Sequence, residues 1–557
     1  MSKKSTIIGM SVVTALTTAA VLLPVFSAHA EPPQGAAGTL VSPNEGAGQA
    51  PGGQQAPGVS SSSVTHSGVM TFTEDMSTDG ESYNSTGNAE NAILMTGGTV
   101  TLTNPVINKT GSDDGDSSDF YGTNAAVFVS GGTLNVSGGS LTTDGSHANG
   151  FFAYGEGIIN VSNTTIKTSS NNSGALMVTG GGTLTATYVT ATTDGNSSAP
   201  IRSDRGGGTM NIEDGSYTSN GVGSPVIYST ADVNVKKATL ESTASEGVVI
   251  EGKNSVSLDG VKMTANNTQL NGQSETYKGI FIYQSMSGDA DEGVGSFTAK
   301  NSDLTVKNGD TFFVTNTTAE INLSNNTFTN TAGGFLRVQT GKWGNSGANG
   351  GVVVLTASEQ EMTGDVFVDN ISSLDMKMSS DSYYKGALNH DNTAQTLRLE
   401  LSSDSVVVLT GDSYISELVN ADTENTNIYS NGFKLYVAGA EVKTNSETAP
   451  EGRKNKTTST TESEDVEAET KTVDDYSTLG FILAMAGSLV VLIVGGILIA
   501  RCMKKPAPKT GPDQDVAPSK PEIAPMTGPD ATPERAKDAG EMHSQANGGQ
   551  VKGPDAR

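Results

Sequence analysis

The stretch SGGTLNVSGGSLTT, at residues 130–143, decides the fold because its pattern returns along the chain at a nearly constant spacing. Six equivalent apolar positions are separated by steps of 25, 25, 26, 23 and 23 residues: Leu134, Ile159, Leu184, Met210, Val233 and Val256. Phe297 follows after 41 residues, which indicates one repeat with a long insertion, and Ile321 follows after 24. The chain is therefore predicted to be a repeat protein with a period of about 24 residues.

Each period contains three short strand-like segments separated by turn residues. In the first period they are residues 133–137, 140–143 and 150–154, with Gly, Asn or Asp between them. Three strands in about 24 residues are typical of one rung of a parallel β-helix, whereas a propeller blade needs about 40 residues. Immunoglobulin-like sandwiches would repeat only every ~100 residues. Residues 66–440 therefore predict an all-β parallel β-helix of roughly 15 rungs, stacked ~4.8 Å apart.

Alternation along the strands predicts which side chains face the core. In the segment 134–136, Leu134 and Val136 point one way and Asn135 points the other way. The residues equivalent to Asn135 share a small, uncharged polar character: Asn160, Thr185, Asn211, Asn234, Ser257, Thr298 and Asn322. We therefore expect a stacked apolar interior and a polar file on the outside of this sheet.

The N-terminus has the pattern of an export signal. Lys3 and Lys4 precede an apolar run at residues 7–26, and Ser-Ala-His-Ala at residues 27–30 resembles a cleavage site. This order of a basic region, an apolar region and small residues is typical of a secretory signal peptide. An uncleaved anchor helix is the alternative.

A second apolar segment predicts a membrane anchor. Residues 479–500 contain no charged residue, and a bilayer core needs ~20 such residues. Arg501, Lys504 and Lys505 follow directly, so the positive-inside rule places the end of the chain in the cytoplasm. Cys502, the single cysteine, lies on that side, so no disulfide can form within the exported part.

These segments predict a single-pass cell-membrane protein with an extracellular N-terminal part. Its regions, in order, are a signal peptide (1–30), a disordered Gly/Pro/Ser-rich leader (31–65), the β-helix ectodomain (66–440), a disordered Thr/Glu-rich stalk (441–478), the transmembrane helix (479–500) and a disordered cytoplasmic tail (501–557).

Phrases such as SGGTLNVSGGSLTT and TGGGTLTAT (179–187) resemble bacterial right-handed parallel β-helix surface proteins. These are adhesins and autotransporter passengers, whose fold is like that of pectate lyases. The resemblance covers roughly residues 66–440. It implies right-handed coiling, surface display, adhesion and, in some members, carbohydrate-active chemistry. The chain departs from autotransporters because a single apolar helix and a polar tail take the place of a translocator barrel.

Charge and metal-binding patterns limit the partners. The net charge of −27 disfavours nucleic acid, whose backbone is anionic. The acidic loops at residues 113–119 and 289–292 could hold Ca²⁺ through oxygen ligands, although neither matches a calcium-loop motif. The histidines His66, His147 and His390 are not at metal-ligand spacing. We expect no cofactor, with calcium as a weak alternative.

The leading hypothesis is a non-enzymatic adhesin or surface-structural protein that binds glycans or proteins. Its partner would bind an outer sheet face or the insertions at residues 267–295 and 339–350. The alternative is a polysaccharide lyase or hydrolase of the pectinase type, centred on Arg202, Asp204 and Arg205. A third idea is that the polar file orders water, as ice-binding solenoids do. No catalytic, cofactor-binding or metal-binding residue is assigned from the sequence.

Overall fold

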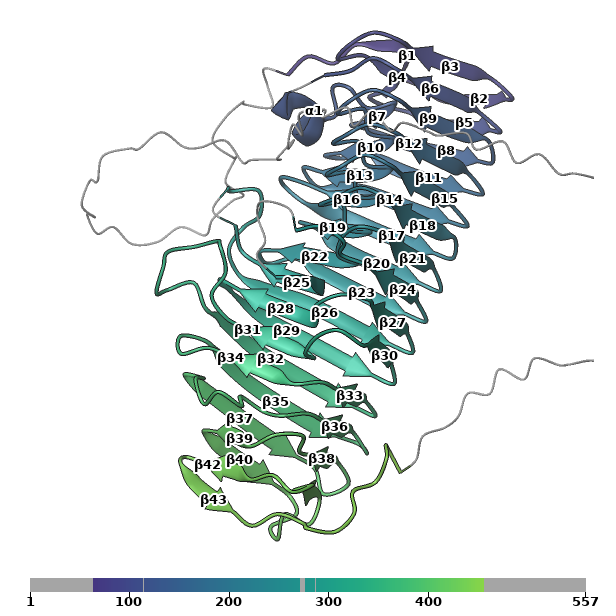
Figure 1. Cartoon of the computed structure of the whole chain (residues 1–557). Coiled ribbons are helices and arrows are strands. Elements are labelled where there is room, and N and C mark those ends of the chain that lie inside the picture. The colour runs from purple at the N-terminus through teal and green to yellow at the C-terminus, as the bar shows by residue number, and fades with distance from the viewer. Residues whose placement is uncertain (1–63, 114, 271–275, 286, 455–557) are drawn as a thin grey trace, which may run out of the picture. The chain divides into compact units, whose positions relative to one another are not determined.

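The computed structural model describes residues 64–454, except residues 114, 271–275 and 286 (Figure 1). The regular elements of this part are short strands joined by turns and loops, with one short helix, α1 (Asp116–Tyr121). The strands stack into three long parallel sheets, and each strand pairs with the one that lies one turn of the coil further along the chain. The predicted parallel β-helix is therefore confirmed.

Sheet A has twelve strands, in the order β1 (Gly68–Phe72), β4 (Asn91–Met95), β7 (Val127–Val129), β10 (Phe151–Tyr154), β13 (Leu176–Thr179), β16 (Ile201–Ser203), β19 (Ile227–Ser229), β22 (Val248–Glu251), β25 (Lys278–Tyr283), β28 (Asp310–Thr315), β31 (Leu336–Val338) and β34 (Val366–Val368).

Sheet B has fourteen strands, in the order β2 (Met76–Asp79), β5 (Thr99–Thr103), β8 (Thr133–Ser137), β11 (Ile158–Ser162), β14 (Gly182–Thr187), β17 (Gly208–Glu213), β20 (Asp232–Lys236), β23 (Ser255–Asp259), β26 (Val294–Lys300), β29 (Thr317–Ser324), β32 (Gly351–Ser358), β35 (Ser373–Ser379), β37 (Thr396–Leu401) and β40 (Glu417–Asn420). The described part of the coil therefore has about 14 turns, close to the expected number.

Sheet C has ten strands, β3 (Ser82–Ser85), β6 (Val106–Lys109), β9 (Ser140–Thr143), β12 (Thr165–Thr168), β15 (Thr190–Thr193), β18 (Ser216–Ser219), β21 (Thr239–Ser242), β24 (Lys262–Ala265), β27 (Asp303–Val306) and β30 (Thr327–Asn330). Sheet D continues beyond it with β33 (Glu361–Thr363), β36 (Tyr383–Lys385), β38 (Val406–Val408) and β41 (Ile428–Tyr429). Sheet E holds β39 (Ser413–Ile415), β42 (Leu435–Val437) and β43 (Ala440–Val442).

The register of sheet B is the one that the period predicts. Leu134 pairs with Ile159, Ile159 pairs with Leu184, and the file continues in step to Phe297 and Ile321. These side chains are buried in one core that runs through the solenoid. A 24-residue rung cannot bury its own apolar face, so each rung depends on its neighbours for stability.

Gly-Gly turns recur in the sequence because the rungs approach each other closely there. Gly132 has φ +79°, a left-handed conformation, and a Cβ at this position would clash with the carbonyl group of Gly98 in the preceding rung. A residue with a side chain would have to strain the backbone and push the rungs apart.

The solenoid continues beyond the predicted boundary at residue 440. β43 pairs antiparallel with β42, and the chain then runs back along sheet D, where Tyr383 Oη donates to the carbonyl oxygen of Pro450 at 3.0 Å. Arg453 reaches Asp381 at 3.8 Å with 8% of its side chain exposed. Residues 441–454 are therefore ordered against the fold. The prediction of a stalk beginning at 441 was wrong here, because these polar residues find partners in rungs distant in sequence.

Several predicted regions lie outside the described residues. They are the signal peptide, residues 31–63 of the leader, the stalk from residue 455, the transmembrane helix and the cytoplasmic tail. Within residues 64–454, apart from the gaps, no helix is long and apolar enough to cross a membrane.

Candidate functional site on the outer face of sheet A

The outer face of sheet A carries a file of large side chains that point away from the core. Its members, in register from rung to rung, are Leu94, Phe128, Phe152, Met177, Arg202, Tyr228, Val249, Phe281, Phe313, Arg337 and Phe367. We call them the sheet A outer file. Several form two apolar clusters that are separate from the main core. This face is therefore chemically unlike the polar outside of sheet B.

Irregular segments cover much of the sheet A outer file. The loop around α1 lies beside β7 and β10 (Figure 1), and the carbonyl oxygen of Phe120 accepts a hydrogen bond from Thr179 Oγ1 at 2.8 Å. His66 stacks on Phe128 with 4.0 Å between ring centroids. Further along, Trp343 lies 5.9 Å from the Tyr283 ring. The insertion at residues 339–350, considered from sequence as a partner-binding element, thus contributes Trp343 to the covering of sheet A.

The motif Arg202-Ser203-Asp204-Arg205 lies at the centre of this covered face. Ile201 and Ser203 face the interior in register with Leu176 and Val178, so Arg202 faces outward. Only alternate residues of β16 face inward. Arg202 and Asp204 are 8% and 5% exposed because the covering segments bury them.

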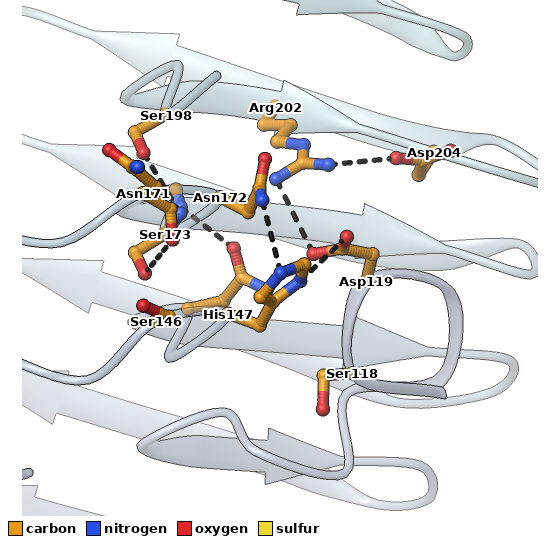
Figure 2. Close-up of polar contacts among 12 residues, drawn as sticks. Ser118, Asp119, Ser146, His147, Asn171, Asn172, Ser173, Ser198, Arg202 and Asp204 are labelled. Atoms are coloured by element: carbon orange, nitrogen blue, oxygen red, sulfur yellow. Dashed lines mark hydrogen bonds and ion pairs between the residues drawn. The ribbon is translucent and has the colours of Figure 1, made fainter. Parts of the chain in front are cut away.

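Carboxylates from two distant loops meet this motif and form what we call the charged cluster: Asp119, His147, Arg202, Asp204, Arg205 and Asp289. Arg202 Nη2 donates to Asp204 Oδ2 at 3.2 Å, and Arg202 Nη1 lies 3.8 Å from Asp119 Oδ1 (Figure 2). Arg205 Nε donates to Asp289 Oδ1 at 2.5 Å, and its guanidinium lies 3.7 Å from the centre of the Phe120 ring. Arg205 thus contacts both loops at once.

His147 extends the cluster toward the neighbouring rung. His147 and Asn172 occupy the same turn position in successive rungs, with φ of 55° and 54°. Asn172 Nδ2 lies 3.0 Å from His147 Nε2, and His147 Nδ1 lies 2.9 Å from Asp119 Oδ2 (Figure 2). An amide nitrogen can only donate, so Nε2 accepts and Nδ1 carries the proton that it donates to Asp119.

Burial shifts the proton equilibria of two carboxyl groups on this face. Burial, together with the nearby charges of Asp289 and Asp119, raises the pKa of Asp204 to about 8, although Arg202 opposes the shift. Burial also raises the pKa of Glu251, whose Oε2 accepts hydrogen bonds from Tyr228 Oη at 2.6 Å and from Tyr283 Oη at 2.8 Å. Glu251 has hydroxyl partners and no cationic partner among the described residues, so a raised pKa lowers the cost of burying this carboxyl group.

The two acidic loops considered for calcium use their carboxylates within the protein. Asp119 and Asp289 face arginines, and Asp113 Oδ2 accepts a hydrogen bond from Ser118 Oγ at 2.5 Å. Among the described residues, no group of three or more His, Cys, Asp or Glu side chains is arranged to hold a metal ion. Calcium binding by these loops stays a prediction.

An open pocket lies at the C-terminal end of the sheet A outer file. Its walls come from three consecutive rungs, because β31 pairs with β34 and Val366 bridges to Leu388. The lining residues are Arg337, Gln339, Phe367, Val368, Asp369, Asn389, His390, Asp391 and Thr393. The guanidinium of Arg337 lies 4.1 Å from the centre of the Phe367 ring. Of the three histidines considered from sequence, only His390 lines this pocket; His66 and His147 lie with the covered part of the face.

The predicted polar file on sheet B is present. Asn160 Nδ2 donates to Asn135 Oδ1 at 2.9 Å, and Asn234 Nδ2 donates to Asn211 Oδ1 at 3.2 Å. Toward the C-terminal end the same file continues through Thr356 to charged residues, so it is not a uniform hydroxyl array: Lys377 and Glu400. The amide side chains of adjacent rungs hydrogen-bond to one another. This pairing gives the recurrence of Asn in sheet B a structural reason that requires no ligand.

The sequence did not reveal the sheet A outer file, although a signal was available. Segments such as AVFV (126–129), FFAY (151–154) and GIFIY (279–283) are continuous apolar runs, which indicate strands buried on both faces. No protein family, curated protein or solved structure is detectably similar to this chain. The functional argument therefore depends on the site itself.

Proposed function

We propose that this protein is a membrane-anchored surface β-helix that binds glycans or other surfaces and catalyses no reaction. The observation that carries the proposal is the outer face of sheet A, where a file of aromatic and arginine side chains ends in an open pocket of polar groups. Ligand sites combine apolar and aromatic walls with a few polar groups that fix orientation. The covering segments bury most of the file, so the pocket is the part of this face that a partner can reach without moving a loop.

The burial of the charged cluster supports a binding function and not a catalytic one. General acid–base catalysis requires a group within hydrogen-bond reach of the substrate. Arg202 and Asp204 are almost fully buried, and their charged neighbours Asp119 and Asp289 already pair with arginines. A substrate would have to displace both loops to reach them. In the described structure these groups hold the loops on sheet A.

The proposed location at the cell surface is supported by the sequence alone. The signal-like residues 1–30 and the apolar residues 479–500, followed by Arg501, together favour one crossing with the β-helix outside. Tagging the chain separately near residue 450 and at its end tests this topology in intact cells. External protease or antibody should reach the first tag and not the second, and the reverse result would contradict the proposed orientation.

A polysaccharide lyase or hydrolase is the second candidate, and one observation favours it. Arg202, Asp204 and Asp119 gather on one outer sheet face, and the pKa of Asp204 is raised to about 8 by burial. A carboxylic acid that stays protonated at neutral pH can serve as a general acid. This candidate requires the covering loops to open, whereas the binding function does not.

One experiment separates the two candidates. The full-length protein in detergent is presented to immobilised glycans and matrix proteins, and the same glycans are analysed afterwards for cleavage products. Binding with intact glycans is the expected result. Products that appear with the parent protein and disappear with Asp204→Asn would support the enzyme instead, and binding no stronger than that of heat-unfolded protein would overturn the proposed function.

A further inference from the structure

The pocket at the end of the sheet A outer file has polar groups that the fold leaves unused. His390 and Asp391 are exposed, and within the described residues the carboxylate of Asp391 has no hydrogen-bond or ion-pair partner. His390 Nδ1 donates to the carbonyl oxygen of Asp412 at 3.0 Å, so its Nε2 is left as an acceptor in the neutral ring. These groups can bind a ligand without first breaking a contact in the protein.

Other lining residues are already fixed by the fold and give the pocket its shape. Asn389 Oδ1 accepts hydrogen bonds from the backbone nitrogens of Thr393 at 2.9 Å and Ala394 at 3.1 Å. Thr393 Oγ1 donates to the carbonyl oxygen of Val368 at 2.7 Å. The turn that carries His390 and Asp391 is therefore held against β34, and a ligand would meet preorganised groups.

The charge of the pocket determines which ligands it accepts. Arg337 Nε donates to Asp310 Oδ2 at 2.5 Å, so the one arginine in the lining is already neutralised. The carboxylates of Asp369 and Asp391 have no cationic partner among the described residues. Asp369 is instead bound by backbone nitrogens, including that of Thr340 at 2.7 Å. The pocket is therefore net negative, and an anionic ligand would be repelled.

We propose that this pocket binds a non-acidic glycan, one that is uncharged or carries free amino groups, and excludes uronate-containing glycans. Phe367 offers apolar surface to a sugar ring, while Asp391, Asp369 and His390 offer acceptors to sugar hydroxyl or ammonium groups. The rest of the sheet A outer file is buried under the covering segments, so the ligand would contact only the three rungs that form the pocket. This inference depends on the proposed binding function and specifies its ligand.

Affinity measurements with three probes test the inference. The full-length protein is titrated with chitosan oligosaccharide, a neutral cello-oligosaccharide and oligogalacturonate of similar length. The amino and neutral probes should bind, and the acidic probe should not. Asp391→Asn should weaken binding of the amino probe about tenfold, because it removes a charge-assisted hydrogen bond. Phe367→Ala combined with His390→Ala should weaken binding of both probes.

Glu156→Gln is the matched control, because it removes an exposed carboxylate in a distant turn and should leave every affinity as in the parent. Equal or tighter binding of oligogalacturonate would overturn the charge argument while leaving a binding function in place. Unchanged affinity in the pocket variants would place the ligand elsewhere. Failure of all three probes, while other glycans or proteins bind, would overturn this inference alone. Failure to bind anything would overturn the proposed function too.

Discussion

Arg205 Nε lies 2.5 Å from Asp289 Oδ1 although 84 positions separate the two residues in the sequence. The same guanidinium lies over the ring of Phe120, which belongs to the loop around α1. One side chain therefore joins two loops that leave the coil at different rungs. Because the loops cover the sheet A outer file, this contact decides how much of that aromatic face reaches solvent.

Arg205→Ala should destabilise the protein by removing this contact. Breaking a mostly buried ion pair leaves Asp289 without its partner and costs about 3 kcal/mol. The side chains of Arg205 and Asp289 are 12% and 17% exposed, so water screens the pair only weakly. The free energy of unfolding in urea measures the effect. Limited proteolysis should also cut within residues 284–293 faster than in the parent.

Lys253→Ala is the control for that measurement, because Lys253 pairs with Asp291 in the same loop while both side chains are more than half exposed. An exposed pair contributes less than about 1 kcal/mol. Equal effects of the two substitutions would contradict the special role assigned to Arg205.

Asp204→Asn should change how stability depends on pH. Its pKa rises from 3.8 to about 8 on folding, chiefly through burial, so the folded protein favours the protonated carboxyl. The stability associated with this group is present below pH 4 and is lost as the pH rises toward 8. Asn cannot ionise, so the variant should lose less stability between pH 4 and pH 9.

Thermal unfolding across this pH range checks the prediction, with pH 4 as the internal reference, where the parent and Asp204→Asn should be similarly stable. Parallel curves for the two proteins would show that Asp204 is ionised in the folded state.

Phe312→Ala should be among the most destabilising single substitutions in the core. Phe312 is fully buried and makes edge-to-face contacts with three aromatic rings. The ring centroids lie 5.5 Å from Phe297, 5.9 Å from Phe328 and 5.6 Å from Phe335. Truncating a buried Phe to Ala costs about 3–5 kcal/mol, because a cavity remains. Phe433→Ala is the control, since Phe433 is 38% exposed. Its free energy of unfolding should stay near that of the parent, and a comparable loss would contradict the packing argument.

Arg453→Ala should loosen the returning C-terminal segment. Arg453 Nε donates to the carbonyl oxygen of Asp381 at 3.1 Å, and its side chain is 8% exposed. A hydrogen bond from a charged group contributes about 1.5–3 kcal/mol. Hydrogen exchange should accelerate at residues 445–454 and at Tyr383, with Lys443→Ala as the exposed control. Exchange that is unchanged in Arg453→Ala would mean that backbone contacts alone hold this segment.

Repetition made the coil predictable. Leu134, Ile159 and Leu184 recur every 25 residues, and parallel stacking requires this because each strand rests on its equivalent one turn later. The outward-facing polar residues next to them, such as Asn135 and Asn160, were predictable because side chains alternate between the two faces of a strand. Beyond Gly350 the period is less regular, yet β32, β35 and β37 remain in register because the apolar alternation continues.

The charged cluster was not predictable, because its members share no period. Asp119 and Asp289 belong to insertions, and an insertion of any length can return to any nearby rung. Neither sequence pattern nor spacing shows that Asp119 faces Arg202 and Asp289 faces Arg205, and calcium binding by the rest of these acidic loops stays a prediction. The pocket was equally hidden, since Arg337, Phe367 and His390 come from three rungs with irregular turns.

The sequence by itself determined that this chain coils into a parallel solenoid with an apolar interior, because a regular period of apolar residues allows only equivalent strands to stack. Tertiary structure alone decided which outer face is covered, which buried carboxyl group has a raised pKa and where a pocket stays open. Those properties depend on side chains brought together by loops, and loop paths follow from three-dimensional packing and not from a repeating pattern.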